Sequence, residues 1–250
     1  MSFTIKMFDA TSADAAHPTV SVDIPEGYKL LGGGALDQAV EPGNLLTASY
    51  PESRTRWTVA GKDHIHSSPS RITAYALALF DPKNEWETII TVAPGAHAQH
   101  PSATAFLPAS YVMTGGGALV DWSGAGNLLT ASYPSGASSW QVHSKDHEVA
   151  DPATIIAYAI GLRRRDRQNV LRRTVAVASG PTAPHPTASI SLPTGWHLTG
   201  GGASDNWFGA GNLLTASYPQ GNAWLAAGKD HDLPSPSSIT VYAIGIRLAL

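Results

Sequence analysis

Short runs of Val, Ile, Thr and aromatic residues alternate with clusters of Gly, Pro, Asn, Asp and Ser along the whole chain. In Ala188–Leu192 apolar and polar residues alternate strictly, which predicts a strand with one buried and one exposed face. In Ile239–Ile246 both faces are apolar, which predicts an inner strand covered on both sides. No window of about 10–12 residues combines helical periodicity with an absence of Gly and Pro, so the pattern predicts an all-β fold. In the last third of the chain the expected strands are Arg173–Ala178, Ala188–Leu192, Trp196–Thr199, Asn212–Tyr218, Trp224–Ala227 and Ile239–Ile246.

The same pattern occurs three times. The segment GGGA begins at Gly32, Gly115 and Gly200, and the segment KDH begins at Lys62, Lys145 and Lys229. GNLLTASYP contains Asn44, Asn127 and Asn212. The first offset is 83 residues and the second is 84 or 85, so three copies fill the chain as repeats of approximately 1–82, 83–167 and 168–250.

Three similar copies without Ser/Gly-rich spacers predict a single domain, 1–250, with pseudo-threefold symmetry. We expect a β-prism-like body of three sheets around the axis, with one sheet per repeat. An enlarged β-trefoil-like ring is the alternative. The chain begins and ends in strand-like sequence, so we also expect the first and last strands to meet and close the ring.

Composition narrows the classes of function. Charged residues make up 14% of the chain, against about 25% in a typical soluble domain. The formal net charge is −3, which gives no footprint for a nucleic-acid partner. The chain has no Cys, which excludes disulfides and thiolate chemistry. It has no apolar run of transmembrane length and no signal-peptide pattern, so we expect a cytoplasmic protein or one released without a classical signal.

The loop between GGGA and GNLL carries a Trp in two of the three copies. Trp122 follows Asp121 and Trp207 follows Asn206, whereas Ala39 takes this place in the first copy. A Trp ring can stack on the apolar face of a pyranose, and Asp or Asn can hydrogen-bond the sugar hydroxyls. Two other interpretations are that these Trp residues close the ends of the sheets or contact a protein.

Each Lys-Asp-His triplet stands where a strand is expected to end and a loop to begin. In the structural interpretation, Asp accepts hydrogen bonds from nearby backbone N–H groups or from His. In the functional one, Asp and His bind a glycan at each of three sites. Imidazole would also suit Zn, Cu or Ni if the three His residues converged on the axis, although we expect neither a metal nor a cofactor. The candidate residues are Asp63, His64, Asp146, His147, Asp230 and His231.

Three further repeated features are expected to be structural. The Gly triplets lack the GxGxxG and GxxxxGK[ST] patterns and are expected to allow close approach of a neighbouring group. One Trp per copy, on strand-like sequence before KDH, is expected in the core. A His-Pro pair per copy is expected to pack before a turn, and it joins the KDH residues only if the fold brings them together. These residues are Trp57, Trp140, Trp224, His17, His100 and His185.

We expect a non-enzymatic protein, because the sequence has no GxSxG, HExxH or paired-carboxylate motif and the KDH triplet occurs three times. A threefold β repeat with one loop site per repeat resembles, in architecture only, the β-prism and trefoil lectins. This resemblance implies multivalent carbohydrate binding, with surface glycans or glycoconjugates as partners. The alternative is a receptor-binding, targeting or surface structural module, such as part of a toxin, spore or phage surface. The expected ligand-binding residues are Asp121, Trp122, Asn206 and Trp207 together with the six Asp and His residues of the KDH triplets.

Overall fold

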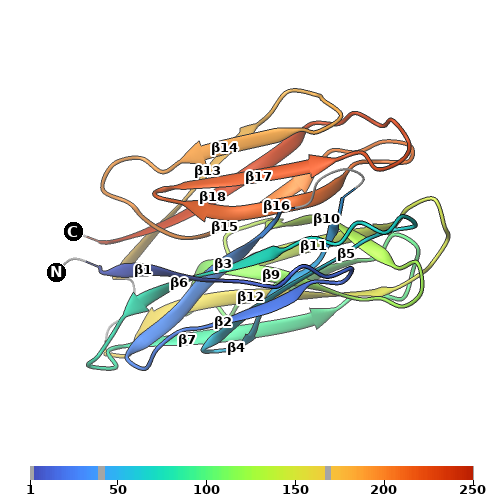
Figure 1. The fold of residues 1–250 in the computed structure, drawn as a ribbon. Coiled ribbons are helices and arrows are strands. Elements are labelled where there is room, and N and C mark those ends of the chain that lie inside the picture. The colour runs from blue at the N-terminus through green and yellow to red at the C-terminus, as the bar shows by residue number, and fades with distance from the viewer. Residues whose placement is uncertain (1–2, 39–42, 167–169, 250) are drawn as a thin grey trace.

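The computed structural model describes residues 3–38, 43–166 and 170–249. These residues form eighteen β-strands, arranged as three six-stranded sheets, and none of them lies in a helix (Figure 1). In the described part of the chain, no helix therefore has the length and hydrophobicity to cross a membrane. The expected all-β class is confirmed.

Each repeat supplies six strands. The first repeat forms β1 (Ile5–Thr11), β2 (Thr19–Asp23), β3 (Tyr28–Asp37), β4 (Leu45–Ser53), β5 (Arg56–Lys62) and β6 (Ile72–Phe80). The second forms β7 (Trp86–Pro94), β8 (Ser102–Phe106), β9 (Val112–Asp121), β10 (Asn127–Pro134), β11 (Ser139–Asp146) and β12 (Thr154–Arg164). The third forms β13 (Leu171–Ser179), β14 (Thr187–Ser191), β15 (His197–Asp205), β16 (Leu213–Gln220), β17 (Ala223–Lys229) and β18 (Ile239–Leu248).

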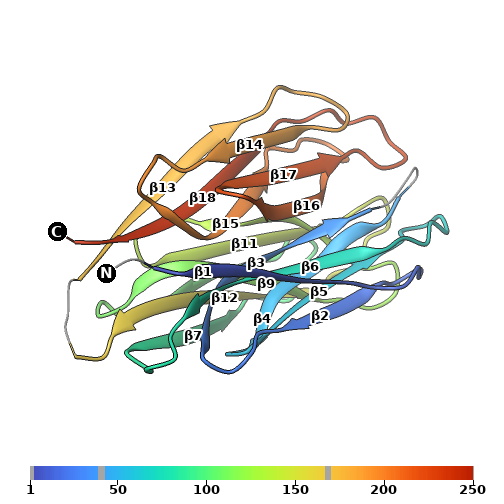
Figure 2. The ribbon, with the colours of Figure 1, turned by 60° about the vertical axis from the view of Figure 1, so that its left-hand side comes forward.

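Every sheet is built from two repeats. The strand orders are β1-β6-β3-β16-β17-β14, β13-β18-β15-β10-β11-β8 and β2-β5-β4-β9-β12-β7 (Figure 2). Each sheet therefore takes the first, sixth and third strands of one repeat and the fourth, fifth and second of another. The expectation of one sheet per repeat is wrong, because the free edge of each third strand pairs with a fourth strand from a different repeat.

The junction between repeats is the same in all three sheets. Ala216 pairs with Leu36, Ala48 with Leu119, and Ala131 with Ser204, always antiparallel. This equivalence gives the body its pseudo-threefold character. The expected pairing of the terminal strands is wrong, since β1 pairs with β6 of its own repeat and β18 lies between β13 and β15.

The Gly triplets lie where the packing is tightest. A methyl group on the middle glycine, such as Gly116, would overlap the ring of Trp140, and one on Gly32 would lie 2.5 Å from the Thr199 carbonyl oxygen of another repeat. Trp140 is fully buried and donates from Nε1 to Ser132 Oγ at 3.0 Å. These contacts confirm both the close approach at the triplets and the core position of Trp57, Trp140 and Trp224.

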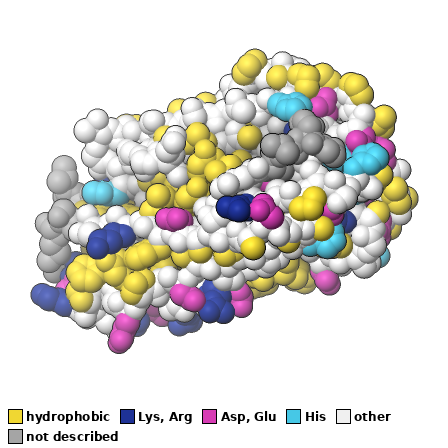
Figure 3. All heavy atoms as spheres, in the orientation of Figure 1, with side chains coloured by type: hydrophobic (Ala, Val, Ile, Leu, Met, Phe, Trp, Pro, Cys, Tyr) yellow, Lys and Arg dark blue, Asp and Glu magenta, His cyan; other side chains and the backbone are white. Residues whose placement is uncertain are grey.

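The body has two different ends. Both termini lie at one end, which we call the terminal end (Figure 1). At the other, which we call the loop end, hydrogen bonds join the loops that follow the first, third and fifth strands. Asp63 N–H and Asn44 Nδ2 both donate to Ala16 O, at 2.8 Å each, and Gly43 N–H donates to Ser68 Oγ. Figure 3 shows several His side chains gathered away from the termini, at this loop end.

Candidate functional site

Three histidines, one from each KDH triplet, meet at the loop end. His64, His147 and His231 are each 1% exposed, and their ring centroids lie 5.5–5.6 Å apart. Because one residue comes from each repeat, the group surrounds the pseudo-threefold axis, and we call it the axial triad. His64 Nε2 lies 2.7 Å from His147 O, and His147 Nε2 lies 2.7 Å from His231 O. These contacts link the repeats, and they bury the histidines away from any ligand at the outer surface.

The three histidines of the axial triad differ in the hydrogen bonding of their ring nitrogens. The Nδ1 atoms of His64 and His147 lie 3.1 Å from the carbonyl oxygens of Ala125 and Ala210. In contrast, neither ring nitrogen of His231 has a hydrogen-bond partner among the described residues. Burial lowers the pKa of His64, and it lowers the pKa of His231 to about 4. Burial thus favours the neutral form of His231, and the nearby Asp232 carboxylate opposes this shift.

A tight turn follows each axial histidine. Ile65, Glu148 and Asp232 have φ angles of 63°, 59° and 59°, in the left-handed region that non-glycine residues rarely adopt. The N–H of the next residue bonds back to the histidine carbonyl at 2.6 Å in all three copies. These are γ-turns, which are strained. In the second and third repeats, the acid after the histidine lies against an axial imidazole, whereas Ile65 is exposed.

The KDH lysines join one repeat to the next. Lys62 donates to the carbonyls of Gly124 and Ala125, and Lys145 donates to that of Ala210. Both lysines are buried, which lowers their pKa values, to about 8 for Lys145. The Nζ atoms lie 4.1 and 4.9 Å from the ring centroids of the two loop Trp residues, so those rings cover the buried ammonium groups.

The KDH aspartates turn the other way, towards the His-Pro pairs. Asp63, Asp146 and Asp230 lie 3.4, 3.1 and 3.5 Å from ring nitrogens of His17, His100 and His185. Backbone N–H groups also donate to the carboxylates of Asp63 and Asp230. The expected hydrogen bonding of these aspartates is confirmed, and the His-Pro histidines do join the KDH aspartates in space.

At two junctions these groups assemble around a Trp. The ring of His17 lies edge-on to Trp122 at 5.5 Å, and that of His100 lies edge-on to Trp207 at 5.5 Å. We call these two groups the loop clusters: His17, Lys62, Asp63 and Trp122, and His100, Lys145, Asp146 and Trp207. In each, the His, Lys and Asp come from one repeat and the Trp from the next.

Only some of the residues expected to bind a ligand lie in the loop clusters. Both loop Trp residues are half-buried against a KDH lysine and a His-Pro histidine, whereas Asp121 and Asn206, which precede them in the chain, are exposed. Asn206 Nδ2 donates to Ser238 Oγ at 3.0 Å. The KDH histidines lie in the axial triad instead, so the expectation that each Asp and His of KDH share a site does not hold in space. Ala39, the counterpart of the Trp residues in the first repeat, lies outside the described residues.

Sequence reasoning missed three contributors to the loop end. Phe208 is 79% exposed directly after Trp207. Glu148 and Asp232 approach the axial histidines through the γ-turns. The only sequence signal for the two acids is their place after KDH, and Ile65 stands there in the first repeat.

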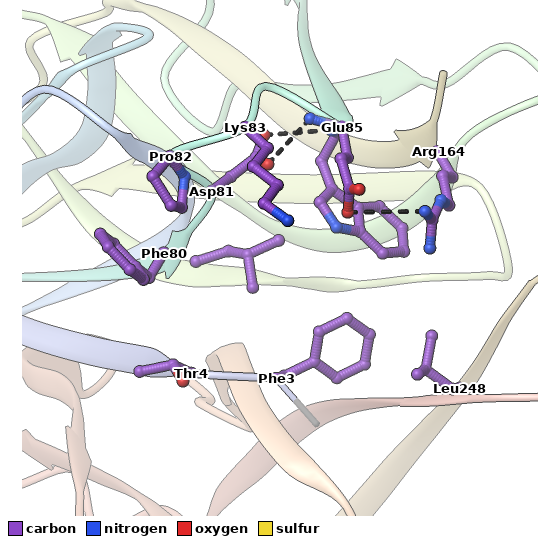
Figure 4. A pocket seen from close by; sticks show the side chains of 11 residues that line it. Phe3, Thr4, Phe80, Asp81, Pro82, Lys83, Glu85, Arg164 and Leu248 are labelled. Atoms are coloured by element: carbon purple, nitrogen blue, oxygen red, sulfur yellow. Dashed lines mark hydrogen bonds and ion pairs between the residues drawn. The ribbon is translucent and has the colours of Figure 1, made fainter. Parts of the chain in front are cut away.

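A cavity of about 320 Å³ opens at the opposite, terminal end (Figure 4). Phe3, Trp86, Arg164 and Leu248 line it, and Arg164 lies 3.5 Å from Glu85. Asp81 supports this corner by accepting hydrogen bonds from the backbone of the following turn. None of the residues expected to bind a ligand lies here.

No family model matches the chain, and no curated protein matches it. One alignment with a solved structure, "The Triple Jelly Roll Fold and Turret Assembly in an Archaeal Virus", has 10% identity and a TM-score of 0.18, and it covers 99% of this chain and 90% of that one. A similarity at that level carries no argument about fold or function.

Proposed function

We propose that the protein is a non-enzymatic, multivalent carbohydrate-binding protein whose sugar sites are the two loop clusters. One observation carries this proposal. Each cluster places a half-buried Trp against an exposed imidazole whose ring nitrogen lies beside a carboxylate, and the same arrangement occurs twice. This combination of an aromatic face and hydrogen-bonding groups matches the two-faced chemistry of a pyranose.

The roles follow from the positions. Lys62 or Lys145 covers one face of each Trp ring, so a sugar would stack on the other face. His17 and His100 have side chains that are 54% and 56% exposed, so their nitrogens can reach sugar hydroxyls. Asp121 and Asn206 supply further polar atoms beside each ring. Two weak sites at fixed spacing gain about 10²- to 10⁴-fold in avidity on a surface that carries many glycans.

A glycan array followed by calorimetry tests the proposal. The labelled chain should bind one class of glycan on the array, and the matching monovalent sugar should titrate about two sites per chain. Trp122→Ala or Trp207→Ala should each remove one site and most of the avidity, because aromatic stacking contributes about 0.5–1.5 kcal/mol beyond buried area.

The matched control is Trp196→Ala. Trp196 is also half-buried and also lies under a cation, Arg247, at 4.5 Å, but it belongs to the terminal end. This variant should bind glycan as the unmodified protein does. Absence of binding to every glycan, or unchanged binding by the Trp122→Ala/Trp207→Ala double variant, would refute the proposal. The first of these results would favour a protein receptor as partner.

A further inference from the structure

The carboxylates behind the axial triad form a second candidate site, separate from the loop clusters. Glu148 Oε1 lies 3.1 Å from His147 Nε2, and Asp232 Oδ2 lies 2.9 Å from His231 Nδ1. Ligand atoms of His147, Glu148 and His231 all lie within 4.8 Å of one another. Thus two imidazoles and one carboxylate from two repeats lie within reach of a single ion, and Asp232 adjoins this group through His231.

We propose that His147, Glu148 and His231 bind one divalent transition-metal ion of the zinc class, and that Asp232 supports the site by holding the His231 ring. Two imidazoles and one carboxylate are a donor set that Zn²⁺, Co²⁺ and Ni²⁺ accept, with water in the remaining position. Such a site would tie the second repeat to the third. It replaces the expectation from the sequence that no metal binds.

The strongest support is the state of His231. Its side chain is fully buried, and neither ring nitrogen makes a hydrogen bond among the described residues, although Nδ1 lies 2.9 Å from the Asp232 carboxylate. A buried polar group without a partner costs about 1–3 kcal/mol, so native proteins rarely keep one. A metal ion at Nε2 would satisfy the nitrogen that does not face Asp232.

The spacing also suits a metal. Ligand atoms of a tetrahedral zinc site lie about 3.3–3.5 Å apart, given bonds of about 2.0–2.2 Å. The distance between His147 Nε2 and Glu148 Oε1, 3.1 Å, lies close to this value, and the ligand atoms of the whole group lie within 4.8 Å, so a bound ion would draw them closer together. The strained γ-turns provide the geometry, since they fold Glu148 and Asp232 back onto the preceding histidines.

An ion could enter from the loop end. The side chains of Glu148 and Asp232 are 24% and 23% exposed, whereas both histidines are fully buried. His66 Nε2, in a side chain that is 59% exposed, lies 3.5 Å from Asp232 Oδ2 and stands at this entrance. The first repeat contributes no carboxylate, because Ile65 occupies the position of the two acids. The site is therefore expected once per chain, and His64, which no acid follows, is not a ligand. An ion at His147 Nε2 would take the place of the contact between that nitrogen and His231 O.

Zinc binding by the full chain tests this inference. After dialysis against a chelator, calorimetry with Zn²⁺ should give one ion per chain, and elemental analysis should confirm that ratio. Co²⁺ in its place should give the intense visible absorption of a tetrahedral site. Glu148→Gln and Asp232→Asn keep the side-chain shape, and each should weaken zinc binding at least about tenfold, with the double variant losing the cobalt spectrum.

The matched control is Glu26→Gln, which removes an exposed carboxylate at the terminal end and should leave zinc binding unchanged. Far-UV circular dichroism checks that each variant is folded. Two results would overturn the inference: no heat at about 100 µM Zn²⁺, or the same binding by the double variant, which would place the ion on exposed histidines. Glycan binding by these variants is measured separately, so loss of one site does not count against the other.

Discussion

At the residue scale, Asp205 is a buried carboxylate with one oxygen that makes no hydrogen bond among the described residues. Asp205 occupies the position that Val120 holds in the second repeat, so the site also accepts an apolar side chain. Asp205 Oδ1 accepts a hydrogen bond from Ser237 Oγ at 2.5 Å, but Oδ2 has no partner among the described residues. Asn212 Oδ1 is likewise without one, and both oxygens face Gly228. Burial raises the pKa of Asp205 to about 7, although Ser237 and Lys145 oppose the shift.

This raised pKa predicts a pH-dependent stability. In the unfolded chain the carboxyl has a pKa near 3.8, so between about pH 4 and pH 7 the folded state holds more protons than the unfolded state. Stability from this group is fully present below about pH 4 and is lost as the pH rises through 7. We expect Asp205→Asn, whose amide can donate to Asn212 Oδ1, to be more stable than the unmodified protein at pH 8 by roughly 1–3 kcal/mol.

Urea denaturation at pH 5 and pH 8 measures this difference. The gain should be large at pH 8 and small at pH 5. The exposed Asp9→Asn serves as control and should show neither gain. An Asp205→Asn variant with the same stability change at both pH values would show that the carboxyl is already ionised throughout this range.

At the scale of elements, the pattern of apolar residues located the strands well. All six strands expected in the third repeat are present. Ala188–Leu192 corresponds to β14 at Thr187–Ser191, and Ile239–Ile246 to β18 at Ile239–Leu248. The strand expected at Trp196–Thr199 is shorter than the observed strand β15, which continues through the Gly triplet from His197 to Asp205. Glycine weakens a strand prediction, yet here the glycines continue the strand because a Trp ring and neighbouring backbones fill the space of their side chains.

The same packing predicts a steep cost for adding one methyl group. In Gly116→Ala the new Cβ would overlap both the Trp140 ring and the Tyr158 carbonyl oxygen. Since Trp140 is fully buried and cannot move aside, we expect a loss of at least about 3 kcal/mol in the free energy of unfolding. Chemical denaturation followed by Trp fluorescence provides the measurement.

Gly136→Ala is the matched control for that variant. Gly136 lies in the exposed turn between β10 and β11, and its added methyl group would meet only the flexible side chain of Ser139. This change should leave stability within about 0.5 kcal/mol. Equal stability of the two variants would mean that the triplet tolerates side chains and that its packing has been misread.

At the scale of the whole molecule, the repeat predicted the threefold body but not the exchange of strands between repeats. Alternating burial is the same whether β3 pairs with β4 of its own repeat or with β16 of another, so periodicity alone cannot choose the partner. The candidate site shows the same limit. Lys62, Asp63 and His64 are consecutive, yet they point to a neighbouring loop, to His17 and to the axis. Only the assembled fold separates these three directions.

The exchange of strands predicts how the molecule unfolds. Because each sheet contains strands from two repeats, unfolding one repeat removes three strands from each of two sheets and exposes their inner edges. No repeat can therefore unfold at low cost by itself, and we expect one cooperative transition. Hydrogen exchange with mass spectrometry, measured over a urea series, should give the same midpoint for β6, β12 and β18. The exposed β10–β11 turn should exchange at every urea concentration and serves as the internal reference. A separate, earlier midpoint for one repeat would mean that the junctions, such as Ala48 with Leu119, contribute little to its stability.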